Sequence, residues 1–207
     1  MNAKSVNGES FKVRRQLQKQ ETRQRLLEAA YQVICDRGML NTRVSDIAQA
    51  AGVSHGALFV HFESLEELIA TVVAEYGGRI ARRTHELASL SASLEELLRA
   101  HLAGIGEYEP FYTRLVMENR LLPQAARDVW IGIQSAISFH FSQLAERELP
   151  GADMALLFNT WMGMVHYYLT NGDLFAPKGR VIPRYADTLV AFYMKLAAGL
   201  AGRIRDE

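Results

Sequence analysis

The segment AGVSHGALFVHF, residues 51–62, places Gly52-Val53-Ser54 between two short stretches whose apolar residues repeat at helical spacing. Two helices joined by a three-residue turn that contains glycine have the form of a helix-turn-helix. Glycine adopts a positive φ at little cost, which lets the second helix leave at a steep angle. We expect Ser54 to cap that second helix. The segment therefore predicts a helix-turn-helix; the alternative is a corner between two helices inside a larger helical protein.

The residues of the segment and of the helix before it separate into an inward and an outward set. Five apolar residues are expected to face inward: Ile47, Ala48, Val53, Leu58 and Phe62. Seven residues are then left partly on the outer face: Ser54, His55, Gly56, Ala57, Phe59, Val60 and His61. In a helix-turn-helix, the N-terminal residues of the second helix contact base edges in the major groove. His55 can donate to guanine N7 or O6, and Ala57 can meet a thymine methyl group.

The rest of the chain also repeats its apolar residues at the spacing of α-helices, and strand-like alternation does not persist. The sequence SLEE occurs at residues 64–67 and 93–96, and each copy is typical of a capping box at the start of a helix. We expect Gly38 to end the first helix and Thr42 to cap the next one. The pattern predicts an all-α fold of about nine helices, three short ones followed by long ones.

Composition excludes several classes of protein. The chain has 207 residues, 49% of them hydrophobic and 22% charged, with a formal net charge of zero, so it is not a polycation along its whole length. Its single cysteine, Cys35, excludes an internal disulfide; we expect a buried packing residue, the alternative being a redox sensor. Neither an apolar run of membrane-spanning length nor a signal-peptide core is found, and we expect a cytoplasmic location.

The charge is nevertheless unevenly distributed. Residues 1–27 contain seven Lys or Arg against two Glu, so the remainder of the chain carries the balancing negative charge. This asymmetry indicates a basic N-terminal arm, residues 1–19, that faces a polyanion. The alternative is a solvated tail without a partner.

From Thr22 to Leu68 the chain resembles the DNA-binding region of the tetracycline-repressor (TetR) family of bacterial transcription regulators. The resemblance is carried by TRQRLLEAAYQVICDRG, residues 22–38, and TRVSDIAQAAGVSHGALFVHFESLEEL, residues 42–68. It implies a three-helix DNA-binding domain with a helix-turn-helix at residues 20–68. A larger helical domain for ligand binding and dimerisation would follow at residues 69–207.

The resemblance also implies a mechanism. Members of this family bind a pseudo-palindromic operator in double-stranded DNA as homodimers, and a small-molecule effector bound by the C-terminal domain releases the DNA. Most of them repress transcription, so a ligand-released repressor is the leading interpretation. The alternative is a helical ligand-binding or scaffold protein with weak or partner-dependent DNA binding.

Nine positions match those at which the family contacts DNA: Thr42, Arg43, Ser45, Ser54, His55, Gly56, Ala57, Phe59 and His61. Thr42 and Arg43 are the ones expected to reach phosphates. Two positions depart from the family pattern, because Phe59 stands where a tyrosine is usual and Leu65 where a lysine is usual. Both departures remove contacts to the DNA backbone, which set affinity and register rather than base choice.

We hypothesise that the basic residues from Lys12 to Arg25 compensate for these two departures. They would do so by lying along phosphates or by entering the adjacent minor groove. The hypothesis predicts that removal of residues 1–19 weakens DNA binding and flattens its dependence on salt.

The C-terminal two-thirds is rich in Met and aromatic residues, which suit an apolar effector cavity. An apolar or aromatic small molecule is the expected effector, and neither a metal nor another cofactor is expected. The alternative for each residue is ordinary core packing. The candidate ligand-binding residues are Met117, Glu118, Trp130, His140, Phe158, Asn159, Trp161, Met162 and His166.

The last two long helices, at about residues 152–170 and 183–203, contain small residues among large ones. The resemblance places the dimer interface on this pair; the alternative is close packing inside one subunit. An enzyme is disfavoured, because the chain lacks paired Glu-x-x-His motifs, an HExxH motif and a Cys/His cluster with zinc spacing. We assign no catalytic residues.

Overall fold

The computed structural model describes the backbone of residues 3–205 and the side chains of residues 12–199. Within the described backbone, the regular elements are ten α-helices and one 3₁₀-helix, with no β-strand. The predicted all-α class is confirmed, and one more α-helix is present than the approximate expectation. The chain forms two compact units, Met1–Val72 and Val73–Glu207.

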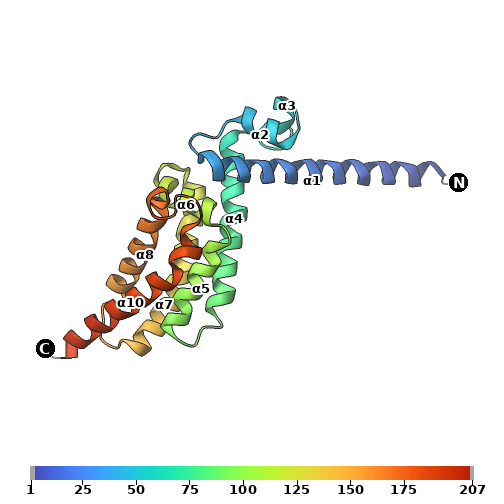
Figure 1. Ribbon diagram of the computed structural model, residues 1–207. Coiled ribbons are helices and arrows are strands. Elements are labelled where there is room, and N and C mark those ends of the chain that lie inside the picture. Colours follow the sequence, from blue (N-terminus) through green and yellow to red (C-terminus); the bar gives the residue numbers. More distant parts are fainter. Residues whose placement is uncertain (1–2, 206–207) are drawn as a thin grey trace. The chain divides into compact units, whose positions relative to one another are not determined.

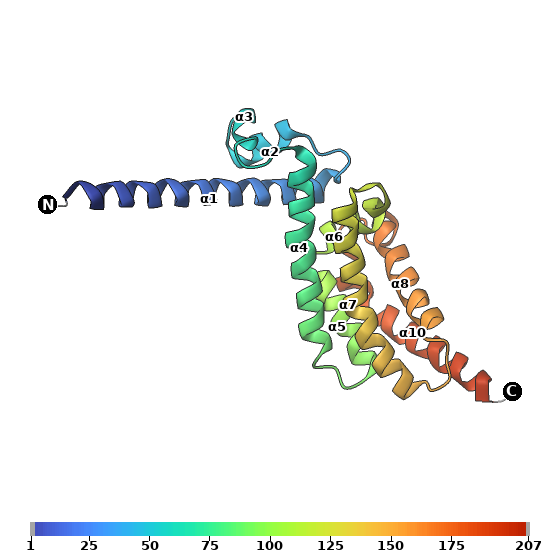
Figure 2. The same cartoon turned by 180° about the vertical axis from the view of Figure 1, so that it is seen from behind.

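The first unit consists of α1 (Ala3–Arg37), α2 (Val44–Ala51), α3 (His55–Leu58) and the beginning of α4 (Leu65–Ala88). Figures 1 and 2 show that the N-terminal half of α1 extends past α2 and α3. The expectation of a short first helix is wrong, because α1 has 35 residues and includes the predicted arm from Ala3 onward. The physical reason is that residues 12–25 consist largely of Lys, Arg, Gln and Glu, which are good helix formers.

The turn between α2 and α3 is the glycine turn that the sequence predicts. Gly52 ends α2 in the left-handed conformation, with a φ of 66°. The Val53 N–H then donates to the carbonyl of Ala48 at 3.0 Å, which satisfies one of the free carbonyls at the end of α2. Leu58 of α3 and Phe62 after it are buried, which fixes the direction of the second helix. The predicted helix-turn-helix is therefore present.

Helix capping in this unit differs in part from expectation. Ser54 occupies the N-cap of α3 with extended backbone, as predicted, although its side chain makes no capping hydrogen bond to the described residues of α3. The N-cap of α2 is Arg43, so the expectation that Thr42 caps this helix is wrong. The Thr42 hydroxyl instead donates to the carbonyl of Gly38 at 2.7 Å and is buried, where it closes the turn after α1.

The second unit contains the rest of α4 and the elements α5 (Leu94–Gly106), α6 (Glu109–Glu118), η1 (Asn119–Leu121), α7 (Gln124–Glu148), α8 (Met154–Thr170), α9 (Gly172–Phe175) and α10 (Val181–Arg205). Both views show α7 and α8 side by side (Figures 1 and 2). α4 and α5 approach closely at Gly104, where an added Cβ would lie 2.5 Å from the Thr84 hydroxyl. Of the described helices, none is both long and apolar enough to cross a membrane.

The two SLEE sequences form the capping boxes that the sequence predicts. The Ser64 hydroxyl accepts from the Glu67 N–H at 3.1 Å, and the Ser93 hydroxyl accepts from the Glu96 N–H at 3.2 Å. The side chain of Glu96 reaches back and accepts from the Ala92 N–H at 2.7 Å. These bonds satisfy amides at the helix starts that have no intrahelical partner.

The start of α10 is held by a residue far away in the sequence. The buried carboxylate of Glu109, on α6, accepts from the backbone N–H groups of Val181 at 2.6 Å and Ile182 at 3.0 Å. A carboxylate is favourable at a helix N-terminus because it meets both the unpaired amides and the positive end of the helix dipole. Glu109 therefore ties the first turns of α6 and α10 together.

Candidate nucleic-acid interface and buried polar cluster

The outward face of α3 and of the turn after it is exposed as predicted. Ser54, His55 and Gly56 are exposed, and the Phe59 and Val60 side chains are 48% and 66% exposed. Ala57 is half-buried. Large apolar side chains that are exposed beside buried anchors of the same short segment are typical of an interaction surface. Contact of these residues with DNA stays a prediction.

Local geometry gives this face a defined shape. The His55 and Phe59 rings lie 5.6 Å apart, one turn from each other, so each restricts the other's position. A Cβ added to Gly56 would meet none of the described atoms within 4 Å. Packing within the chain therefore does not require glycine at this position. What glycine does provide is a bare stretch of backbone that a partner surface can approach closely.

His61 lies at the edge of this face and is half-buried, on the side of α1. Burial lowers its pKa, and the positive charges of Lys19 and Arg23 lower it further. Its Nδ1 is buried and has no hydrogen-bond partner among the described residues. The Arg23 guanidinium lies 4.9 Å from the ring centroid of the neighbouring Phe62. These contacts link the end of the α3 segment to α1.

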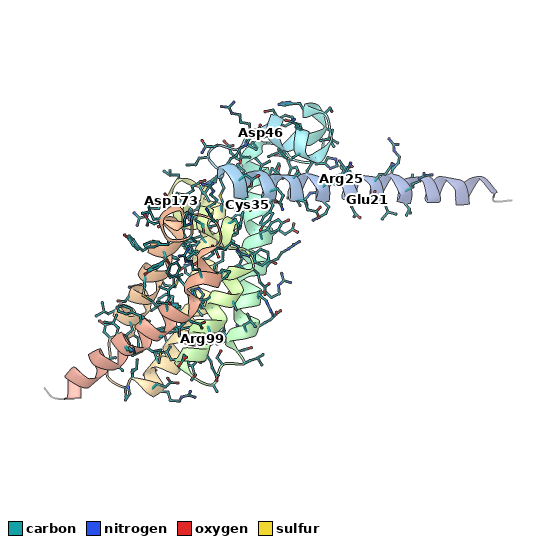
Figure 3. All side chains as sticks on the ribbon, viewed as in Figure 1. Glu21, Arg25, Cys35, Asp46, Arg99 and Asp173 are labelled. Atoms are coloured by element: carbon teal, nitrogen blue, oxygen red, sulfur yellow. The ribbon has the colours of Figure 1, made fainter. Side chains whose placement is uncertain are left out.

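A wide groove runs between α1 and this segment, with a volume of about 1250 Å³. One wall comes from α1 between Lys12 and Arg25, and the other comes from Val60 and His61. Figure 3 labels Arg25 and Glu21, the one acidic residue of this wall. The groove is lined mainly by cations and amides, so it suits an anion that can extend along a helix.

Three residues at the start of α2 are predicted to contact DNA, and two of them are accessible. Arg43 and Ser45 are exposed. Asp46, in the first turn of α2, pairs with Arg37 of α1 at 3.0 Å (Figure 3 labels Asp46). Thr42 is 5% exposed and its hydroxyl already donates to the carbonyl of Gly38; its contact with a phosphate stays a prediction.

In the second unit, four side chains form a polar cluster in which Tyr112 is buried and the other three are half-buried: Tyr112, Trp130, Gln134 and His166. The Tyr112 hydroxyl lies 3.0 Å from His166 Nε2 and accepts from the Gln134 amide at 3.2 Å. The Trp130 ring lies 5.6 Å from that of Tyr112 and 5.7 Å from that of His166. Since the Tyr112 hydroxyl already accepts from Gln134, its own proton is available to donate to His166.

A second buried pair lies beside this cluster. The indole of Trp161 donates to His101 Nδ1 at 3.0 Å, which places the His101 proton on Nε2. Burial lowers the pKa of His101 to about 3, with a smaller contribution from His166. Burial lowers the pKa of His166 to about 4 and raises the pKa of Tyr112. These three groups are therefore uncharged at neutral pH.

Of the other predicted ligand residues, two lie at the surface and one makes a different contact. Met117 is 53% exposed and Asn159 is also exposed, and their contact with a ligand stays a prediction. His140 lies elsewhere, with its Nε2 2.8 Å from His85 Nδ1 on α4. The remaining three contribute to packing: Glu118, Phe158 and Met162. Methionine is tolerated on a surface as well as in a core, so the residue type alone did not predict that Met117 is exposed.

Sequence reasoning missed His101, Tyr112 and Gln134. His101 carried a usable signal, since it lies between Leu98 and Leu102 on an apolar face. A histidine in such a position must find a hydrogen-bond partner or lose its charge. Gln134 had no comparable signal, because amides are common on exposed helix faces.

Similarity in sequence to known proteins is concentrated in the N-terminal part of the chain. Residues 26–72 match the model of the family described as bacterial regulatory proteins, tetR family. The HTH-type transcriptional regulator TtgR of Pseudomonas putida is 37% identical over 79 residues, 38% of this chain and 35% of that protein. The HTH-type transcriptional repressor KstR2 of Mycolicibacterium smegmatis is 30% identical over 96 residues, 46% of this chain and 47% of that protein. The chain thus spans less than half the length of these curated relatives.

Solved structures extend the likeness over most of the chain. The regulator FadR of Bacillus subtilis, in complex with stearoyl-CoA, has a TM-score of 0.67 at 19% identity, covering 82% of this chain and 96% of that one. AibR, in complex with isovaleryl coenzyme A and operator DNA, has a TM-score of 0.66 at 22% identity, covering 83% of this chain and 97% of that one. At these identities the likeness establishes a shared fold.

Proposed function

We propose that this chain is a ligand-responsive DNA-binding transcriptional repressor of the tetR family of bacterial regulatory proteins, whose family model matches residues 26–72. It would bind a pseudo-palindromic operator in double-stranded DNA as a homodimer in the cytoplasm. A small apolar or aromatic effector would release it. The observation that carries the proposal is the exposed Ser54-His55-Gly56 face, presented by a segment whose Leu58 and Phe62 are buried.

The geometry of this face suits the major groove. A groove about 12 Å wide admits a helix, whose N-terminal residues then face the base edges. Ser54 and His55 supply hydrogen-bonding groups there, while Gly56 removes the steric obstacle to close approach. Arg43 and Ser45, exposed at the start of α2, are in place for phosphate contacts that fix register.

The homodimer is supported by exposed apolar residues on α8 and α10. Leu156 and Tyr167 on α8 are exposed, and so are Phe192 and Leu196 on α10. Between the two on α8, Gly163 has open space, since an added Cβ would meet none of the described atoms within 4 Å. Residues spaced by three, four or seven share one face of a helix, so the exposed apolar residues of each helix lie on one face, which on α8 also includes the exposed Asn159. We propose that the same two helices of a second copy cover it.

The proposed homodimer is tested by measuring the molecular mass of the protein in solution. Phe192→Glu places a charge in the proposed interface and is expected to convert the protein to monomer, as measured by sedimentation. Leu90→Glu is the matched control, because Leu90 is an exposed apolar residue that follows α4 and belongs to neither helix. A dimer that survives Phe192→Glu would place the interface elsewhere.

The effector site is proposed at the cluster around Tyr112 and His166. Its groups are neutral, so it suits an uncharged aromatic or apolar molecule that carries one hydrogen-bonding group. The chain has two tryptophans, and both Trp130 and Trp161 lie in or beside this cluster. Their fluorescence therefore reports on occupancy, with Trp130→Phe as the variant that locates the signal. Enzymatic activity is not part of the proposal, since the named relatives are regulators.

One observation favours the second candidate, a scaffold or ligand-binding protein with weak or partner-dependent DNA binding. The exposed ring of Phe59 lacks the hydroxyl that the family pattern provides for a phosphate, and Leu65 lacks a charge. Weak binding would follow if α2 and α3 were the sole source of backbone contacts.

The deciding experiment is fluorescence anisotropy of the purified chain with labelled DNA fragments that flank its own gene. Random duplex DNA is added as competitor at physiological salt. Competitor-resistant binding with two subunits per site supports the repressor. Binding to every fragment that competitor removes equally supports the second candidate, since it lacks base readout.

A further inference from the structure

We propose that the N-terminal half of α1 is a second DNA-contacting element, which lies along the sugar-phosphate backbone next to the half-site that α3 contacts. This inference rests on the proposed function and adds to it the partner of the groove between α1 and the α3 segment. The occupant is one strand of the operator duplex, outside the base pairs read by α3.

The first argument is the register of the basic residues on α1. Lys12, Arg15 and Lys19 line the groove, and helical spacing of three and four residues puts them on one face. That face continues the stripe that is buried farther along the same helix, where Leu26 and Ala30 contact the rest of the unit. The same side of α1 therefore changes from apolar to basic where it passes beyond the helix-turn-helix.

The second argument is the composition of the opposite wall. Val60 and His61 follow directly on α3, so the groove borders the face proposed to read bases. His61 lies on this wall, and its buried Nδ1 lacks a hydrogen-bond partner among the described residues. A strand leaving the α3 site on this side would meet the cations of α1.

The third argument is length. From Lys12 to Lys19 the helix rises about 10 Å, at 1.5 Å per residue. One strand of B-DNA presents a phosphate every 3.4 Å along its axis, so this length covers about three phosphates. Three of the four cations that line the groove fall within this length, Arg25 being the fourth, and Glu21 is the one acidic residue on the same wall.

The helical state of the arm also decides between the two modes suggested by the sequence. An α-helix with its side chains is about 10–12 Å wide, whereas the minor groove of B-DNA is about 6 Å wide. An extended arm fits that groove, but residues 12–25 are helical throughout. The arm is therefore assigned to phosphates and not to the minor groove.

The test compares the full-length chain with the triple variant Lys12→Gln/Arg15→Gln/Lys19→Gln. Glutamine keeps the helix propensity while it removes the charge. Arg14→Gln is the control, because Arg14 is exposed on the same helix but does not line the groove. The probe is a fragment bound in the anisotropy experiment, cut to about 40 base pairs, or roughly four turns. Affinity is measured at several salt concentrations.

We expect the triple variant to lower the slope of log K against log salt by about 0.9 for each phosphate that is no longer neutralised, which is roughly 2–3 per subunit. Affinity near 0.1 M salt should fall by on the order of 10- to 100-fold, with little change for Arg14→Gln. Trimming the base pairs outside the half-sites should remove the difference between the wild type and the triple variant. Exchanging A·T for G·C in those flanks should leave affinity unchanged, because phosphate contacts carry no base information.

The outcomes separate this inference from the proposed function. If the wild type binds tightly and the triple variant keeps the same salt slope, the arm does not contact DNA and the repressor stands. A preference of the wild type for A·T flanks would assign the arm to the minor groove and overturn the phosphate assignment. If the wild type binds none of the duplexes above random DNA, the proposed function itself is wrong.

Discussion

The two units of this chain place their polar side chains in opposite ways. In the first unit, Ser54 and His55 lie exposed on a segment held from below by the buried Leu58. In the second unit, Tyr112 and His101 lie inside the helical bundle and bond to other side chains. A polar group at a surface can be exchanged without disturbing packing, whereas a buried one is tied to its partners. Substitutions should therefore change binding in the first unit and stability in the second.

The largest expected effect is that of Trp161→Ala. The variant removes a fully buried indole and leaves His101 Nδ1 without its donor. Loss of a buried Trp side chain costs about 3–5 kcal/mol, and an unsatisfied buried group adds to that. We expect the second unit of this variant to unfold at a markedly lower urea concentration than that of the wild type. Leu90→Ala, at a side chain that is 83% exposed, is the control and should change the free energy of unfolding by less than about 0.5 kcal/mol.

Acidification is expected to have the next largest effect. The folded-state pKa values of His101 and His166, about 3 and about 4, lie below the ordinary 6.5. Below pH 6.5 the unfolded chain binds protons that the folded chain does not, so stability falls as pH falls. Between pH 7 and pH 5 each histidine should remove about 1.5–2 kcal/mol of the free energy of unfolding.

The check is the slope of that free energy against pH. His101→Gln removes one of the two titrating groups and should reduce the slope between pH 4.5 and 6 by about 1.4 kcal/mol per unit. An unchanged slope would show that His101 is not a source of the acid sensitivity, and would weaken the contrast between the units.

His55→Ala tests the expectation that substitutions in the first unit change binding and not stability. We expect the variant to lose about 1–3 kcal/mol of operator binding, as for a good base contact, and to relax the choice at one base position in each half-site. Its urea midpoint should equal that of the wild type, because His55 is exposed. Equal loss of affinity for operator and for random DNA would instead make His55 a backbone contact.

The contrast between the units also explains what could be predicted from the sequence. The helix-turn-helix follows from local signals: Gly52 demands a left-handed turn, and Leu58 and Phe62 fit one buried side. These signals lie within a few residues of one another, so a pattern reveals them. The full length of α1 was not predicted, because a charged helix without an apolar stripe shows no hydrophobic periodicity.

The interior of the second unit could not be predicted in the same way. Tyr112 meets His166 and Trp161 meets His101, and each pair joins residues more than fifty positions apart. Which of several Met, His and aromatic residues converge depends on how the helices pack, and helix periodicity alone does not specify that. Met117 and His166 therefore looked equally suited to a cavity, although only the second is in the cluster.

The smallest predicted effect uses the one motif that both units share. Ser64 and Ser93 begin α4 and α5 with the same SLEE sequence and accept from the third residue on at 3.1 and 3.2 Å. Replacing either by Ala should cost about 1 kcal/mol, because each removes one capping bond from an exposed helix start. The measurement is the urea midpoint of each single variant.

Equal decreases in stability would mean that the serine capping bond contributes the same free energy in both units. The contrast between the units would then come from their buried side chains. A decrease at Ser64 larger by more than about 1 kcal/mol would contradict this, since capping alone does not reach that size. The start of α4 would then be part of what holds the first unit together. In that case Ser64→Ala should also weaken operator binding, whereas Ser93→Ala should leave it unchanged.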